Sequence, residues 1–260
     1  MTVLGMRYGT PSMDDAITEL EKRHVRRMLV LPMYPQYSGT TTASVFDEVT
    51  NRLQRTRWIP ETRFINQYVD EEKYIAALAN SVKKSWSDNG KGDLLVTSYH
   101  GIPKRYLLNG DPYHCQCHKT TRLLRDALGL PEDKVKVVFQ SRVGREPWLQ
   151  PYCDETMKTL PEQGVKSIDI LCPGFSADCL ETIEEINEEN REYFEHAGGE
   201  RFNYIPCLND NPDIIEALAD LVVRHAQGWP ETDRQIHHDS DYQARKRREM
   251  ELREREPVNT

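Results

Sequence analysis

Short apolar runs alternate with amphipathic stretches along most of this chain. The runs at 94–99, 134–140 and 167–171 have the length and apolar content of buried strands, and stretches with helical spacing lie between them. Strands that alternate with helices are typical of βα units on a parallel sheet. The sequence therefore predicts an α/β fold.

The order of these runs predicts the elements and their grouping. Ser12 is a candidate N-cap for the first helix, and the turn-rich cluster at 87–92 separates two rounds of βα units. We expect strands at 3–8, 27–34, 63–69, 94–99, 134–140, 167–171 and 201–205, and helices at 12–25, 43–55, 71–86, 117–128, 148–160, 178–194 and 212–227. We expect a first lobe over 1–88, a second lobe over 89–210, a closing helix over 211–228 that packs back on the first lobe, and a charged, disordered or loosely helical tail over 229–260.

Composition and missing motifs exclude several classes of protein. The 260 residues carry 34 Lys and Arg against 42 Asp and Glu, and this net charge of −8 argues against a nucleic-acid partner. There is neither a span of roughly 18–20 apolar residues nor a secretory signal, so we expect a cytoplasmic protein whose six cysteines are reduced thiols. The motifs GxxxxGKS/T, GxGxxG, GxSxG and HExxH are absent. Nucleotide-driven, nicotinamide-dependent and standard hydrolase chemistries therefore lack their anchor residues.

Residues that follow the predicted strands are the first candidates for a site, because ligands of open α/β sheets bind beyond the carboxyl ends of the strands. His100 follows the strand at 94–99, where a neutral imidazole could ligate a metal or accept a proton near pH 7. It could equally order its own loop through hydrogen bonds. The polar loop at 140–148 ends in Trp148 and suits a flat apolar ligand with anionic groups, for which Arg7 is a further candidate.

A ridge of carboxylates lies on the helix predicted after the strand at 167–171. Glu181, Glu185 and Glu189 recur at i, i+4 and i+8, which is one face of an α-helix. Such a ridge could conduct a cation or protons, or it could be a solvated acidic face, which is the preferred interpretation from Glu189 onward. Asp178 with Glu181 three residues on also resembles a capping box, so a structural role for both residues stays open.

The string His114–His118 (HCQCH) contains two cysteines and two histidines within five residues. These residue types ligate zinc and iron–sulfur clusters. Cys115 and Cys117 diverge on a helix, however, and no second closely spaced pair is present to complete the ligand set. A structural metal here is the less favoured interpretation.

Five strings in order carry a resemblance to a known family. They are 98–103 (SYHGIP), 110–113 (GDPY), 139–144 (FQSRVG), 147–149 (PWL) and 172–182 (CPGFSADCLET). Over about residues 4–225, the chain resembles ferrochelatases of the proteobacterial type. The resemblance implies a type I chelatase fold, in which two flavodoxin-like lobes with parallel sheets flank a porphyrin cleft. It also implies a lyase-type activity, the insertion of Fe(II) into protoporphyrin IX in the last step of haem synthesis.

The resemblance also assigns roles to individual residues. His100 matches the family's site histidine and Glu181 its partner glutamate, and both are candidate ligands of the incoming metal. Glu185 and Glu189 match the acidic line behind Glu181, and Asp178 matches the acid at the start of that helix. The cleft-lining positions match Tyr34, Ser141, Trp148 and Phe175, and a polar inner position matches Arg7. The implied partners are protoporphyrin IX and ferrous iron, and peripheral contact with a membrane surface stays open.

The chain also departs from this family pattern. The leading segment that holds the family's first βα unit and the apolar lip over the porphyrin has no counterpart here, so we expect an incomplete first lobe. Gly39 stands where several relatives place a cluster cysteine, and we expect no [2Fe–2S] cluster and no cofactor beyond the substrate Fe(II). The alternatives are a porphyrin- or haem-binding fragment without activity, a chelatase for another metal or tetrapyrrole such as a cobalt enzyme, and a zinc or iron–sulfur protein built on Cys115 and Cys117. Glu181 argues against the cobalt enzymes, which typically centre on paired histidines.

Overall fold

The computed structural model describes residues 1–230, 244, 247–248 and 250–251. The chain separates into two compact units, Met1–Leu218 and Ala219–Thr260. Most of the charged tail predicted at 229–260 lies outside the described residues, so that prediction is left untested.

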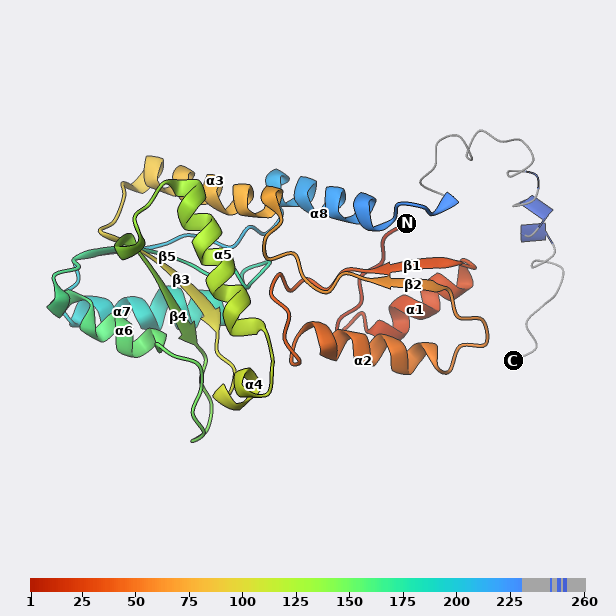
Figure 1. The fold of residues 1–260 in the computed structure, drawn as a ribbon, viewed down its shortest axis with the longest axis horizontal. Helices are drawn as coiled ribbons and strands as arrows, with labels where there is room; N and C mark the ends of the chain where they lie inside the picture. Colours follow the sequence, from red (N-terminus) through yellow and green to blue (C-terminus); the bar gives the residue numbers. More distant parts are fainter. Residues whose placement is uncertain (231–243, 245–246, 249, 252–260) are drawn as a thin grey trace. The chain divides into compact units, whose positions relative to one another are not determined.

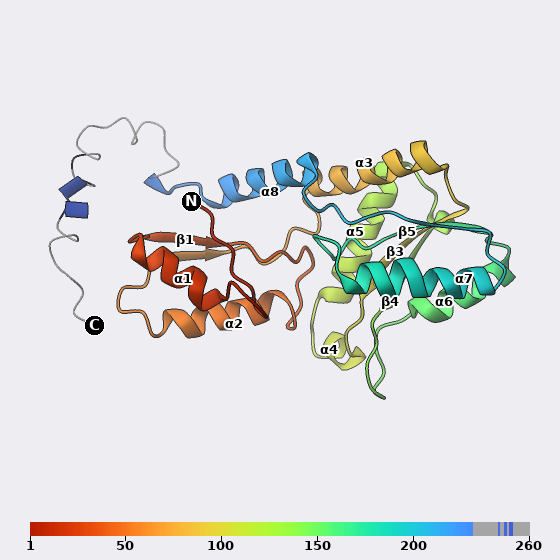
Figure 2. The same ribbon diagram turned by 180° about the vertical axis from the view of Figure 1, so that it is seen from behind.

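A four-stranded parallel sheet forms the larger part of the first unit, in the order β4-β3-β5-β6. Its strands are β3 (Leu94–His100), β4 (Val135–Gln140), β5 (Ser167–Leu171) and β6 (Arg201–Tyr204). Figure 1 shows α5 (Tyr113–Leu128) in front of this sheet, and Figure 2 shows α6 (Cys153–Thr159) and α7 (Asn190–His196) on the opposite face. Both faces of the sheet are therefore covered, as parallel sheets require.

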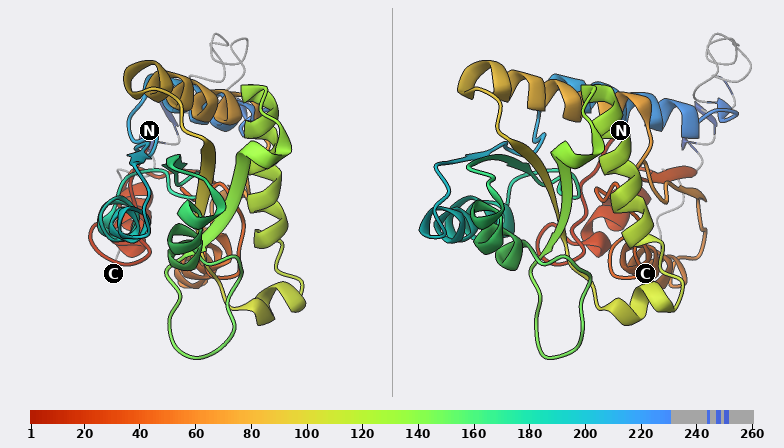
Figure 3. Two further views of the ribbon diagram at one scale, coloured as in Figure 1. Left: turned by 90° about the vertical axis from the view of Figure 1, so that its left-hand side faces the viewer. Right: turned by 60° about the vertical axis from the view of Figure 1, so that its left-hand side comes forward.

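Alternate side chains of the strands pack on opposite faces of this sheet. Val96 and Val138 join a buried cluster with Met157 of α6, Phe194 of α7 and Ile186. Tyr99 and Phe139 instead pack with Tyr113 and Cys117 of α5. The end-on view in Figure 3 shows the sheet between these two helical layers. Because all the strands are parallel, their carboxyl ends meet at one edge, where the candidate site lies.

A smaller parallel sheet is formed by the amino-terminal part of the chain. Its two strands are β1 (Arg27–Val30) and β2 (Glu61–Phe64), and α1 (Met13–Lys22) and α2 (Thr42–Leu53) pack against them. Polar contacts connect this part to α5 and the loop before it, since Ser38 Oγ donates to Asp111 and Gln36 donates to Thr120 of α5. The remaining helices are α3 (Glu72–Asn89), α4 (Lys104–Leu108) and α8 (Pro212–His225), with short 3-10 helices at Glu132–Lys134 and Pro161–Gln163 and a π-helix at Glu181–Glu189.

Several predicted elements match the structure closely. The strand at 167–171 is β5 residue for residue, and the helix predicted after Ser12 begins at Met13. Ser12 and Asp15 form a reciprocal capping box, with Asp15 N donating to Ser12 Oγ at 3.1 Å and Ser12 N donating to Asp15 Oδ2 at 2.9 Å. The predicted α/β class with parallel sheets is confirmed.

Other predicted boundaries were wrong. Residues 3–8 form no strand, only an isolated bridge between Met6 and Ser12, and the strand predicted at 27–34 ends at Val30. The strand predicted at 63–69 ends at Phe64, and α4 was not predicted. The helix predicted from Trp148 begins at Cys153, because Pro151 disfavours helical conformation at the residue before it. The helix predicted at 178–194 begins at Glu181, and its first nine residues form a π-helix.

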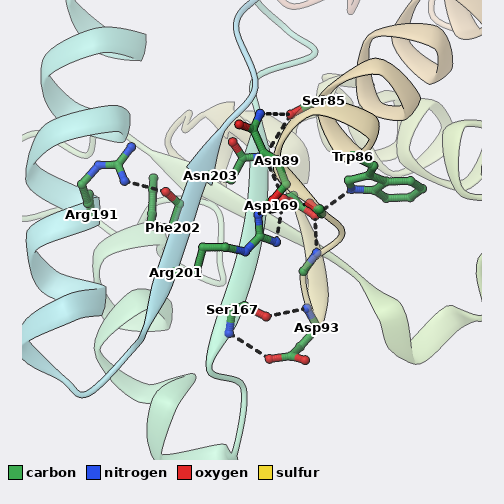
Figure 4. A network of polar contacts seen from close by, with 12 residues as sticks. Ser85, Trp86, Asn89, Asp93, Ser167, Asp169, Arg191, Arg201, Phe202 and Asn203 are labelled. Carbon is green, nitrogen blue, oxygen red and sulfur yellow. Dashed lines mark hydrogen bonds and ion pairs between the residues drawn. The ribbon is translucent and has the colours of Figure 1, made fainter.

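The middle of β5 carries one buried carboxylate, that of Asp169, which Figure 4 shows among its donors. Asp169 is 1% exposed and accepts hydrogen bonds from Trp86 Nε1 at 2.7 Å and Gly92 N at 2.8 Å. Arg201 and Asn203 of β6 donate to its other oxygen. This network joins the end of α3 to β5 and β6, and so fixes the frame that carries the carboxyl ends of the strands.

Candidate active site at the carboxyl ends of the strands

His100 is the last residue of β3, and its hydrogen bond fixes its tautomer. The Nδ1–H of His100 donates to the carbonyl oxygen of Gly101 at 2.7 Å. Since a carbonyl oxygen can only accept, the neutral ring carries its proton on Nδ1 and keeps a lone pair on Nε2. The imidazole is half-buried, and the indole of Trp148 lies with its ring centre 6.5 Å away. His100 can therefore both order its own loop and act in chemistry, because the hydrogen bond from Nδ1 leaves the Nε2 lone pair available as a base or metal ligand.

Glu181 begins the π-helix and has an exposed carboxylate. Cys179 Sγ donates to its Oε2 at 2.9 Å. This thiol bond, a bond from its own backbone N–H and the nearby His100 imidazole in its protonated form hold the pKa of Glu181 below its ordinary value, against the opposing effect of burial. Glu181 thus stays ionised and lies within electrostatic reach of the imidazole.

Asp178 does not form the capping box that its spacing to Glu181 suggested. The N-cap of the π-helix is Leu180, without a side-chain cap. The Asp178 carboxylate instead accepts from Asn209 Nδ2 at 2.8 Å, from Cys207 N at 3.2 Å and from the hydroxyl of Tyr204. Burial would raise the pKa of Asp178, but these donors outweigh it and hold the pKa below its usual range. The geometry makes Asp178 an anchor for the start of the helix.

Glu185 is bound to the loop that follows β4. Ser141 N donates to Glu185 Oε1 at 2.6 Å, and the Ser141 hydroxyl donates to Oε2. Glu185 and Glu189 line one surface pocket of about 190 Å³, whose other lining residues are Phe139, Gln140, Ser141, Arg142, Asp154, Asn190 and Tyr193. The ridge predicted from i, i+4 spacing is thus divided, since Glu181 is not among the lining residues of this pocket.

The remaining predicted cleft residues lie in three places. Trp148 Nε1 donates to the carbonyl of Val143 at 2.9 Å, which holds the indole beside His100. Phe175 packs against the buried cluster that contains Ile186. The Arg7 guanidinium binds Ser44 and Glu48 of α2 and lies near Tyr34. The pKa of Tyr34 is raised overall, because burial and the nearby Tyr8 raise it more than Arg7 lowers it.

Sequence reasoning missed two residues of this site, Gln140 and Cys179. Gln140 is 3% exposed and pairs in register with His100 across the β3–β4 ladder. Its place at the end of a strand parallel to that of His100 was a signal that could have singled it out. Cys179 carried no such signal, because its contact with Glu181 depends on the backbone path before the π-helix.

The HCQCH string lies at the start of α5. Cys117 is buried, Cys115 is exposed, and the rings of His114 and His118 lie with their centres 4.5 Å apart. Burial lowers the pKa of both imidazoles. Within residues 1–230 and the few described tail positions, there is no group of three or more His, Cys, Asp or Glu that could hold a metal ion. In the same part of the chain, no helix combines the length and apolar content needed to cross a membrane.

Comparisons with known proteins agree with one another. The family model described as ferrochelatase matches residues 1–226. The ferrochelatase of Marinobacter nauticus is 58% identical over 224 residues, which cover 86% of this chain and 60% of that protein. The ferrochelatase of Hydrogenovibrio crunogenus is 56% identical over 230 residues, covering 88% of this chain and 61% of that protein. This chain thus spans about three fifths of the length of these relatives.

Solved structures with low sequence identity share the fold. SirB from Bacillus subtilis with Fe3+ has a TM-score of 0.60 at 15% identity, and the match covers 84% of this chain and 79% of that one. CbiX, the terminal enzyme for biosynthesis of sirohaem in denitrifying bacteria, has a TM-score of 0.51 at 13% identity, with 77% and 76% covered. These likenesses confirm the predicted chelatase fold.

Proposed function

The chain belongs to the ferrochelatase family, and we propose that it carries the site at which Fe(II) is inserted into protoporphyrin IX to form protohaem. The observation that carries the proposal is the pair formed by His100, with a free lone pair on Nε2, and Glu181, an ionised carboxylate within electrostatic reach. One group can accept a proton and the other can hold a divalent cation.

The chemistry requires two protons to leave the macrocycle as one metal ion enters. The two pyrrole N–H groups lose their protons, all four ring nitrogens bind Fe(II), and the iron keeps its oxidation state. We assign the first proton acceptor to Nε2 of His100, because Nδ1 is already committed to the Gly101 carbonyl. Glu181 binds Fe(II) as the ion loses water, since carboxylates ligate Fe(II) in protein sites such as the 2-His-1-carboxylate triad.

The other predicted residues serve this step indirectly in the proposal. Glu185 and Glu189 share a pocket through which protons reach solvent. Asp178 holds the start of the π-helix, and Trp148 with Phe175, Tyr34, Ser141 and Arg7 forms the wall for the porphyrin. A wall that favours a buckled macrocycle lowers the barrier, because the distorted ring resembles the transition state.

Anaerobic metallation by the 260-residue chain tests the proposal. Loss of porphyrin fluorescence with Fe(II) or Zn(II) would support it, provided that His100→Ala abolishes the loss while porphyrin binding stays within a few-fold. A chain that binds porphyrin but never metallates it would instead be a porphyrin- or haem-binding fragment.

Metal content and choice of substrate complete the proposal. We propose that the protein needs no cofactor beyond its substrate Fe(II), so purified protein should contain no stoichiometric inorganic sulfide. We also propose protoporphyrin IX over other tetrapyrroles and Fe(II) over Co(II), which parallel assays with both metals and with coproporphyrin test.

The cellular site is proposed from family resemblance alone. We place the activity in the cytoplasm, and a peripheral contact with the membrane surface is the alternative. Fractionation of cells at low and high salt separates the two, because a peripheral protein leaves the membrane pellet when salt is raised.

A further inference from the structure

Gln140 touches both halves of the proposed catalytic pair. It is the last residue of β4, it is 3% exposed, and it pairs in register with His100 on β3. Its backbone contacts the loop of His100, and its side chain contacts the helix of Glu181. Gln140 also lines the pocket of Glu185 and Glu189, but the proposed mechanism assigns it no step.

The His100 side is held through the backbone of Gln140. Gly101 N donates to the carbonyl oxygen of Gln140 at 2.7 Å. The Gly101 carbonyl in turn accepts the Nδ1–H of His100 at 2.7 Å. A Cβ at Gly101 would lie 2.9 Å from the Gln140 carbonyl oxygen, so the two strand ends approach as closely as glycine allows. The position of the His100 ring therefore follows from that of the Gln140 backbone.

The Glu181 side is held through the Gln140 amide. Nε2 of Gln140 donates to the backbone carbonyl of Glu181 at 3.1 Å. Oε1 accepts from Ser98 Oγ at 2.8 Å and from Cys172 Sγ at 3.7 Å. The partners fix the amide orientation, because both groups near Oε1 are donors and the Glu181 carbonyl can only accept. The side chain thus ties the first residue of the π-helix to β3 and to the end of β5.

We propose that Gln140 is the positioning residue that sets the place of Glu181 relative to His100. The effect on catalysis rests on the proposed function, whereas the effect on the position of Glu181 rests on the hydrogen bonds alone. Gln140 touches neither metal nor porphyrin in this scheme, and it acts through the backbone carbonyl of Glu181. A site that must hold two groups at a fixed separation needs such support, because small displacements of a reacting group lower rates severely.

Hydrogen exchange of the 260-residue chain tests the positioning without any substrate. Gln140→Met keeps the length and burial of the side chain but removes its three hydrogen bonds, to Ser98, Cys172 and Glu181. We expect amide exchange in the peptide covering the π-helix at 181–189 to rise about tenfold, as for the loss of one buried hydrogen bond. Gln140→Glu, which keeps an acceptor for Ser98 but loses the donor to Glu181, should have the same effect.

Two controls separate positioning from a general loss of stability. Thr97→Val removes a buried hydrogen bond to Thr121 from the same strand and contacts neither His100 nor Glu181. It should leave exchange at 181–189 unchanged. The tautomer of His100, read from its imidazole nitrogen shifts, should survive in Gln140→Met, because the backbone of residue 140 is retained.

Metallation by the same proteins tests the catalytic meaning. Gln140→Met should lower kcat at least about tenfold while the KM for porphyrin stays within about twofold. Unchanged exchange at 181–189, an equal rise in Thr97→Val, or a loosened π-helix with native kcat would each overturn the inference. If exchange responds as expected but the native chain never metallates porphyrin, the positioning stands and the proposed function fails.

Discussion

The Glu185 carboxylate binds both the backbone N–H and the hydroxyl of Ser141. Ser141 has a φ of 63°, a left-handed backbone conformation that residues other than glycine rarely adopt. The carboxylate therefore holds the loop after β4 in a strained turn, in addition to its place in the proposed proton route.

This hydrogen-bonded pair predicts that substitutions of Glu185 and Ser141 differ in their effect on the free energy of unfolding. Glu185→Gln should destabilise the fold by about 1–3 kcal/mol, because it removes charge-assisted hydrogen bonds to a loop that depends on them. Urea unfolding measures the loss. Ser141→Gly should cost less, since glycine removes the backbone strain as the hydroxyl bond is lost. Equal losses for the two variants would contradict the account of the turn.

The thiol of Cys179 predicts a pH effect on the site. Its hydrogen bond is the largest cause of the lowered pKa of Glu181, so Cys179→Ala should move that pKa up toward its ordinary value of 4.5. If metallation needs ionised Glu181, the acid limb of the rate profile moves to higher pH. Cys115→Ala removes an exposed thiol on α5 and serves as the matched control. An acid limb that moves equally in both variants would refute this role.

Gly101 predicts a steric effect at the strand ends. A Cβ there would lie 2.9 Å from the Gln140 carbonyl and 3.2 Å from the Trp148 ring. Gly101→Ala should separate β3 from β4 locally and break the bond from Gly101 N. We expect about 1–3 kcal/mol of destabilisation, as for other overpacked sites, and loss of the single His100 tautomer. If Gly101→Ala keeps native stability and native imidazole nitrogen shifts, the strand ends can accommodate a Cβ and the prediction is wrong.

Asp178 predicts an acid-dependent part of stability. Its pKa is lower in the folded chain than its ordinary value of 3.8, because its hydrogen bonds outweigh burial. A lowered folded pKa means that the stabilisation is complete above 3.8 and is lost as pH falls through the folded value. Native protein should therefore lose stability below pH 3.8 more steeply than Asp178→Asn does. Parallel pH profiles of the two proteins would contradict this.

The sequence predicted the larger sheet and the strand-end position of His100, because short continuous apolar runs between stretches with helical spacing can be read locally. It failed at 3–8, where an apolar run forms only a bridge, and at the start of α6, where Pro151 outweighed helical spacing. It could not anticipate the π-helix, since i, i+4 spacing fits α- and π-helices alike. The contacts of Gln140 and Cys179 depend on tertiary register, which no local pattern encodes.

The resemblance assigned roles to residues that the local patterns alone left open. Asp178 and Glu181 were consistent with a capping box until the structure gave Asp178 its own set of donors. The catalytic and cleft roles of His100, Glu181 and the other named residues are still predictions.

The most direct test of the paired site is a double-mutant cycle on initial rates of Zn(II) insertion into protoporphyrin IX. The account predicts turnover by the native chain that falls by at least about a hundredfold in His100→Ala and in Glu181→Gln. The double variant should be no slower than the slower single variant, because two groups that act in one step are not additive. Turnover that survives either substitution, or penalties that multiply in the double variant, would contradict the claim that His100 and Glu181 act together.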